Sequence, residues 1–188
     1  KAPSSSSEAA ACAISRIILR NDPTARDAIE RQEVTMYEAI SKNAVRVGVS
    51  TVYIPFNDMW TYRVRMSLLS IAEQESRWMD DNPSEESRLA NPFRPVKEVQ
   101  LTRRLWIITD ADGHEERVEG EAVIGQYPIL EPGGRPFSYQ SQTNLPGGGP
   151  GTMSGGFYFV EGTIERPTGS EFFAKCPYFM LTRPRFMF

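Results

Sequence analysis

From Val45 to the end, the chain repeatedly alternates between apolar and polar residues, and turn residues separate the alternating runs. Val45, Val47 and Val49 alternate with polar or small neighbours, which is typical of a β-strand with one buried face. Further strands are predicted over residues 62–68, 99–109, 115–121, 137–142, 153–160, 172–175 and 179–182. About seven or eight short strands joined by turns predict a mainly β protein, an antiparallel two-sheet sandwich.

The N-terminal part of the chain has a different period. Asp22 and Pro23 form a pair expected at a helix start, and apolar residues then recur every three or four positions. The pattern predicts a helix over about residues 23–42 and a shorter one over residues 9–20. Together they would form an N-terminal helical extension, residues 1–43, ahead of a sandwich over residues 44–188. These helices pack either on their own sandwich or on another subunit, where Ile17, Ile29 and Met36 are the candidate partner-binding residues.

An acidic insertion that contains prolines, about residues 71–95, interrupts the strand pattern. Its composition predicts a long irregular loop, and loops of this length in compact domains are either disordered or functional. The insertion is thus either a mobile, solvent-exposed loop or a partner-binding segment. In the second case Trp78 and Phe93 would be the anchors, because aromatic side chains dominate interface hot spots. The C-terminus leaves the same choice, since Phe186 and Phe188 either fold back onto the sandwich or insert into a neighbour.

The segment from Gly120 to Pro128 nearly spells the G-x-G-x-x-G sequence of dinucleotide-binding sites. That motif needs a helix that opens at its last glycine, because the free N–H groups of the helix bind the pyrophosphate. Pro128 and the residues after it show no helical period, and Ala122 stands at the position of the middle glycine. The segment therefore predicts a strand turn, with Gly120 and Gly125 as candidates for binding a small anion. The glycine-rich residues 147–151 are expected to form a loop between strands.

This segment and the motifs around it resemble the ApaG domain. The resemblance rests on Gly120-Glu121-x-Val123-x-Gly125-x-x-Pro128-x-Leu130-x-Pro132-Gly133, Phe137-x-Tyr139-x-Ser141, Gly151-Thr152-Met153-x-Gly155-x-Phe157 and the upstream run from Leu105 to Gly113. It extends over about residues 45–181 and implies an immunoglobulin- or fibronectin-III-like β-sandwich. It also implies a protein-interaction unit without established catalysis, as in bacterial ApaG and in the ApaG modules of F-box and polymerase-interacting proteins. Ala122 and the acidic insertion depart from the family's pattern.

Charge and cysteine content argue against several kinds of partner and cofactor. With 21 basic and 24 acidic side chains the net charge is −3, so nucleic acid is not expected as a direct partner. The apolar runs are far shorter than the roughly 20 residues that span a bilayer, which leaves peripheral membrane association through partners. Cys12 and Cys176 form no C-x-x-C pair and have no histidine nearby, so we expect two reduced thiols, no metal and no cofactor. His114, the single histidine, is expected to be a surface turn residue.

The sequence shows no nucleophile beside a base and no convergent set of metal ligands. We therefore expect no catalytic residues and a non-catalytic protein–protein interaction module, an accessory or structural subunit of a hetero-oligomeric complex. The Ser- and Ala-rich segment after Lys1 resembles the trimmed edge of an imported precursor, which predicts a mitochondrial or plastid location, with the cytoplasm as the alternative. The competing hypothesis is a regulatory protein that binds a small anion or a nucleotide through its glycine-containing loops.

Overall fold

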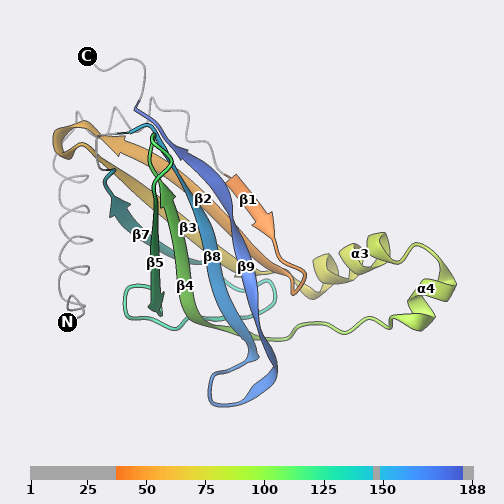
Figure 1. Cartoon of the computed structure of the whole chain (residues 1–188). Coiled ribbons are helices and arrows are strands. Elements are labelled where there is room, and N and C mark those ends of the chain that lie inside the picture. The colour runs from red at the N-terminus through yellow and green to blue at the C-terminus, as the bar shows by residue number, and fades with distance from the viewer. Residues whose placement is uncertain (1–36, 146–148, 184–188) are drawn as a thin grey trace.

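The alternating pattern turns every second strand residue inward, and the inward side chains form a core between two β-sheets. Figure 1 shows how the strands of the two sheets are arranged. The structure is a computed structural model that describes residues 37–145 and 149–183. All pairs of named strands in it are antiparallel. The mainly β, antiparallel sandwich predicted from the sequence is confirmed.

The first sheet has the strand order β1-β2-β3-β7. It comprises β1 (Tyr37–Ile40), β2 (Val45–Ile54), β3 (Met59–Leu68) and β7 (Phe137–Thr143). A short 3-10 helix, η1 (Pro55–Asn57), connects β2 to β3 and ends at Asp58, which has left-handed backbone angles. The Asp58 carboxylate accepts hydrogen bonds from the Tyr53 hydroxyl at 2.7 Å and the Arg183 guanidinium at 2.6 Å. The bond from Arg183 therefore connects the β2–β3 turn to the C-terminal end of the described chain.

The second sheet has the order β5-β4-β8-β9, and β6 also pairs with β4. It comprises β4 (Val99–Thr109), β5 (Glu115–Glu121), β6 (Ile129–Leu130), β8 (Gly151–Gly162) and β9 (Pro167–Leu181). β9 lies close to β1 and β2 of the first sheet, so the sheets approach each other along this side. On the other side, β5 and β7 each pair with one neighbour among the described strands.

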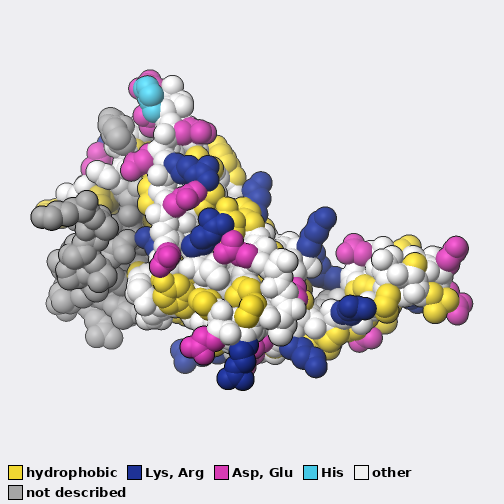
Figure 2. Space-filling model, turned by 60° about the horizontal axis from the view of Figure 1, so that its bottom comes forward, with side chains coloured by type: hydrophobic (Ala, Val, Ile, Leu, Met, Phe, Trp, Pro, Cys, Tyr) yellow, Lys and Arg dark blue, Asp and Glu magenta, His cyan; other side chains and the backbone are white. Residues whose placement is uncertain are grey.

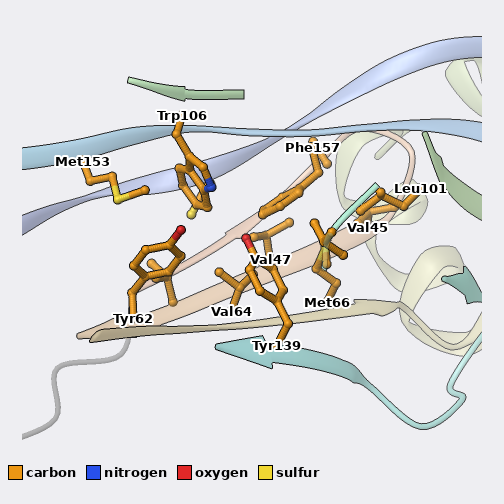
Figure 3. Close-up of a cluster of buried hydrophobic side chains, with 14 of the residues drawn as sticks. Val45, Val47, Tyr62, Val64, Met66, Leu101, Trp106, Tyr139, Met153 and Phe157 are labelled. Atoms are coloured by element: carbon orange, nitrogen blue, oxygen red, sulfur yellow. The ribbon is translucent and has the colours of Figure 1, made fainter. Parts of the chain in front are cut away.

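An aromatic cluster fills the space between the sheets (Figure 3). Trp106 of β4 lies edge-on to Tyr62 of β3 and to Phe157 of β8, with ring centroids 5.5 Å and 5.4 Å apart. Tyr139 of β7 lies edge-on to Phe157 at 6.2 Å. All four rings are buried. Edge-to-face pairs contribute about 0.5–1.5 kcal/mol each beyond their buried area, so the cluster joins β3 and β7 to β4 and β8.

The centre of the second sheet requires glycines in β8. Gly155 has a φ of 126°, and a Cβ atom on it would lie 2.1 Å from the carbonyl oxygen of Leu105 in β4. A Cβ atom on Gly156 would lie 2.3 Å from the carbonyl oxygen of Ala174 in β9. Both obstacles are backbone atoms of the neighbouring strands, so a side chain at either position would push the strands apart.

Two helices form most of the insertion, so the prediction of an irregular loop over residues 71–95 is wrong for residues 71–81 and 85–90. α3 (Ile71–Asp81) begins at Ser70, whose hydroxyl oxygen accepts the N–H of Glu73 while the Glu73 carboxylate accepts the N–H of Ser70. α4 (Glu85–Ala90) begins at Ser84, whose hydroxyl oxygen accepts the N–H of Ser87. These caps satisfy N–H groups that have no partner inside the helix, and glutamates in the first turn complement the helix dipole. No described helix is long and apolar enough to cross a membrane.

Tyr37–Ile40 form the edge strand β1, so the predicted helix over residues 23–42 is wrong at its C-terminal end. β1 pairs with β2, and Tyr37 lies opposite Val49. The other predictions for the termini concern residues outside the described ones: the helices predicted before residue 37, and the residues Cys12, Ile17, Ile29, Met36, Phe186 and Phe188. Residues 146–148 of the glycine-rich loop also lie outside them.

Replacing Gly155 with alanine should lower the free energy of unfolding by about 3 kcal/mol or more, because the methyl group meets the Leu105 carbonyl and the φ of Gly155 disfavours a side chain. Gly48→Ala is the matched control, since a Cβ atom there would meet only the Tyr37 carbonyl oxygen, at 3.8 Å. Urea unfolding followed by tryptophan fluorescence measures both variants. Equal, small losses in the two would contradict the steric role of Gly155.

Cys176 is fully buried, and burial raises the pKa of its thiol to about 12. In a folded Cys12→Ser variant this thiol should not react with Ellman's reagent at about pH 8, because only the thiolate attacks the reagent and the core excludes it. Unfolding in guanidinium should make the thiol reactive. Rapid reaction of the folded variant, with unchanged circular dichroism, would show that this part of the core opens readily.

Candidate functional site

The tip of the β4–β5 hairpin holds the one group of three potential metal ligands found among the described residues: Asp110, Asp112 and His114. Asp110 Oδ1 accepts the backbone N–H of Asp112 at 3.0 Å and that of His114 at 2.9 Å. These bonds, the one from His114 above all, lower the pKa of the Asp110 carboxyl. The His114 side chain is 80% exposed and lies 3.3 Å from Asp110. Asp110 thus shapes the turn, and the ligand groups lie on an exposed tip instead of in a cleft.

The glycine motif forms a hairpin turn and no helix follows it. Val123 and Gln126 exchange backbone hydrogen bonds of 3.0 Å and 2.9 Å, and the two residues between them, Ile124 and Gly125, have φ values of 46° and 73°. Two residues of positive φ are typical of a type I′ turn, which explains the glycine at position 125. The structure therefore offers no helix N-terminus for an anion at Gly125.

Gly120 lies beneath the side chain of Arg104. A Cβ atom on Gly120 would lie 3.1 Å from the Arg104 guanidinium. The same guanidinium donates hydrogen bonds to the carbonyl oxygens of Glu121, at 3.2 Å, and Ala122, at 2.9 Å. Arg104 thus stabilises the end of β5, and Gly120 gives it room to do so.

A cavity of about 320 Å³ lies between the sheets on the side of β5 and β7. It is lined by Trp106 and Tyr139, whose side chains point toward each other from opposite sheets (Figure 3). The Trp106 N–H and the Tyr139 hydroxyl are buried, and neither has a hydrogen-bond partner of standard geometry in the described chain. Burial, assisted by the nearby Tyr62, raises the pKa of Tyr139 well above its usual value. A hydroxyl that stays protonated can donate to an acceptor, such as a water molecule, but it does not act as a base.

α3, α4 and the chain that returns to β4 form an arm that projects from the sandwich (Figure 1). Its base is held by Gln74, the one buried polar residue among the described ones. The Gln74 amide donates to the carbonyl oxygens of Leu69 at 2.9 Å and Val96 at 3.1 Å, and its oxygen accepts the Val96 N–H at 2.9 Å. One side chain therefore binds both the outgoing and the returning end of the arm.

The structure brings together the two aromatic residues predicted as anchors. The Trp78 and Phe93 rings are 5.6 Å apart, and the Trp78 N–H donates to the carbonyl oxygen of Asn91 at 2.8 Å. Both side chains are half-buried. They hold the returning segment of the arm against α3, so they build the arm as well as contributing to its surface.

The large apolar residues that the arm exposes most are not the two that the sequence analysis chose as partner-binding candidates. Leu89 of α4 is 78% exposed and Met79 of α3 is 43% exposed. Figure 2 shows hydrophobic side chains along the arm among charged ones. The spacing of Ile71, Trp78 and Met79 fits one side of a helix and could have indicated α3 from the sequence. Leu89 belongs to no such pattern.

Comparison with known proteins gives concordant results. The sequence model of the ApaG domain matches residues 57–161. The ApaG protein of Maricaulis maris is 48% identical over 88 residues, which are 46% of this chain and 61% of that protein. The F-box protein SKIP16 of Arabidopsis thaliana is 32% identical over 155 residues, which are 78% of this chain and 32% of that protein. The chain thus spans less than two thirds of the length of each of these two relatives.

A solved structure gives the same result for the fold. The crystal structure of the ApaA protein of Bordetella pertussis superimposes with a TM-score of 0.54 at 25% sequence identity, covering 76% of this chain and 95% of that one. The family model covers more than half of the 188 residues, and the two-sheet fold agrees with it. The chain therefore belongs to the ApaG domain family.

Proposed function

We propose that this protein is a non-catalytic protein-interaction module that serves as an accessory subunit of a larger hetero-oligomeric assembly. The observation that carries the proposal is the arm of residues 71–95, which stands away from the sandwich and keeps apolar side chains in solvent. The F-box relative supports an interaction role for a domain of this family. An organellar location, predicted from the N-terminal composition, stays a prediction.

The arm has the physical properties of a docking element. Burying a Leu or Met side chain completely is favourable by about 1.5–3 kcal/mol, so Leu89 and Met79 could together contribute a substantial part of a binding free energy. The capping bonds of Ser70 and Ser84 and the Gln74 amide order the arm before any partner arrives. A preordered element loses less conformational entropy on binding than a flexible loop does.

The chemistry of the described residues favours binding over catalysis. The single histidine lies on the exposed hairpin tip, and the hydroxyl and thiol that are most deeply buried, Tyr139 and Cys176, have raised pKa values. Raised pKa values keep both groups neutral, the opposite of what an activated nucleophile needs. Tyr139 and Cys176 instead contribute to the packing of the core.

A Met79→Ser/Leu89→Ser variant should lose its partners without losing its fold. Both side chains are exposed, so their replacement should change the melting temperature by no more than about 2 °C. The measurement is affinity purification from the native source with quantitative mass spectrometry, together with size-exclusion chromatography of the purified proteins. We expect proteins that co-purify in fixed stoichiometry with the wild type to fall at least tenfold in abundance with the variant, roughly 1.4 kcal/mol or more.

The matched control is Glu75→Gln/Ser76→Ala, which changes two exposed residues of α3 without altering the apolar side chains. The control should retain every partner of the wild type. If the Met79/Leu89 variant also retains all of them, or if the wild type purifies as a monomer without stoichiometric partners, the proposed role is wrong.

A further inference from the structure

An open hollow of about 750 Å³ lies at the outer face of the first sheet. Arg63 and Arg65 line it from β3, where they occupy two successive outward positions. Arg135 lines it from the loop before β7. All three residues are exposed, so three arginines that solvent can reach line one hollow.

These three arginines lack a carboxylate partner among the described residues, unlike four arginines elsewhere in the sandwich. Other arginines form ion pairs: Arg46 with Glu38 and Glu73, Arg103 with Glu171, Arg117 with Glu119, and Arg183 with Asp58. Arg63, Arg65 and Arg135 pair with no described carboxylate. In a chain with a net charge of −3, this is a local concentration of uncompensated positive charge.

The strands around the hollow leave the guanidinium groups uncovered. Arg65 lies opposite Gly48 of β2 and Ser138 of β7, and Arg63 lies opposite Ser50 and Gln140. These neighbours are small or uncharged, so they neither cover nor neutralise the arginines. On β1 the same row continues to Glu38, which Arg46 already holds at 3.1 Å.

The hollow also has an apolar side. Ile129, which is 48% exposed, lines it together with Pro128 and Pro136. An inorganic anion would gain nothing from these side chains, whereas a polypeptide could place an apolar residue on them. Arg63 and Arg65 are separated by one residue of a strand, about 7 Å, which is also the spacing of alternate side chains in an extended peptide.

We infer that this hollow binds an acidic, extended segment of a partner polypeptide. Carboxylates of the segment pair with Arg63, Arg65 and Arg135, and an apolar side chain packs on Ile129. Guanidinium–carboxylate pairs are charge-assisted and directional, so they fix the register of the segment as well as attracting it. A nucleic acid would need a longer basic tract, because its affinity grows with the number of phosphates that are neutralised.

Fluorescence anisotropy with a labelled peptide of about nine residues, built from Glu-Glu-Leu repeats, tests the inference on the full chain. Binding should be saturable and should weaken as salt is added. The Arg63→Glu/Arg65→Glu variant should bind at least about tenfold more weakly, because two attractive contacts become repulsive. The control Arg94→Glu/Lys175→Glu makes the same charge change at two exposed basic residues. These residues line neither the hollow nor the adjoining pocket that shares Ile129, so binding should stay within about twofold of the wild type.

Two outcomes would overturn the inference. An equal loss in both double variants would mean that the peptide responds only to overall charge. The second outcome combines two observations: a peptide with serines in place of the leucines still binds, and tripolyphosphate displaces the labelled peptide as well as unlabelled peptide does. Together they would mean that the hollow is a site for anions in general.

The inference adds a second surface to the proposed interaction role and is separable from it. The Met79→Ser/Leu89→Ser variant leaves the hollow intact and should bind the acidic peptide with wild-type affinity. Failure of peptide binding therefore leaves the role of the arm untouched, and loss of the arm's partners leaves the hollow untouched.

Discussion

The contact between the two sheets over Trp106 and Phe157 is the constraint on which the rest of the structure depends. It brings β4 and β8 against Tyr62 and Tyr139 of the first sheet, and it requires β8 to lie tightly between β4 and β9. Gly155 permits that approach because it has no side chain. Once the inward side chains are fixed in this way, the outward positions of the same strands are determined as well, and these positions form the surfaces of the protein.

The interior and the surface have separate roles. In the interior, burial raises the pKa of Tyr139 and Cys176 and keeps both side chains neutral. At the surface, the arm exposes Leu89, and the outer face of the first sheet carries arginines that pair with no carboxylate of the described chain. The family relation to bacterial ApaG and to an F-box protein fits this division, because a stable sandwich can carry different surfaces.

Features that depend on neighbouring residues were predictable from the sequence, and features that depend on distant ones were not. The strands and the turn after Val123 follow from local period and turn chemistry. The start of α3 was also readable, because Ser70 and Glu73 have capping-box spacing, but the acidic and proline-rich composition concealed it. β1 continues the helical period of the segment before it, and only its pairing with β2 makes it a strand. That Arg63 has no carboxylate partner within residues 37–145 and 149–183 depends on contacts between strands, which no sequence pattern shows.

The Gln74 amide has a consequence for how the protein could change over evolution. It binds Leu69 and Val96, so the two ends of the arm meet within reach of a single side chain. Because the arm leaves and re-enters the sandwich at one point, its length has little effect on the positions of the strands. Lengthening such an insertion also costs little closure entropy. Different arms could therefore be grafted at this point without reworking the sandwich, and the choice of partner could diverge while the fold stays the same.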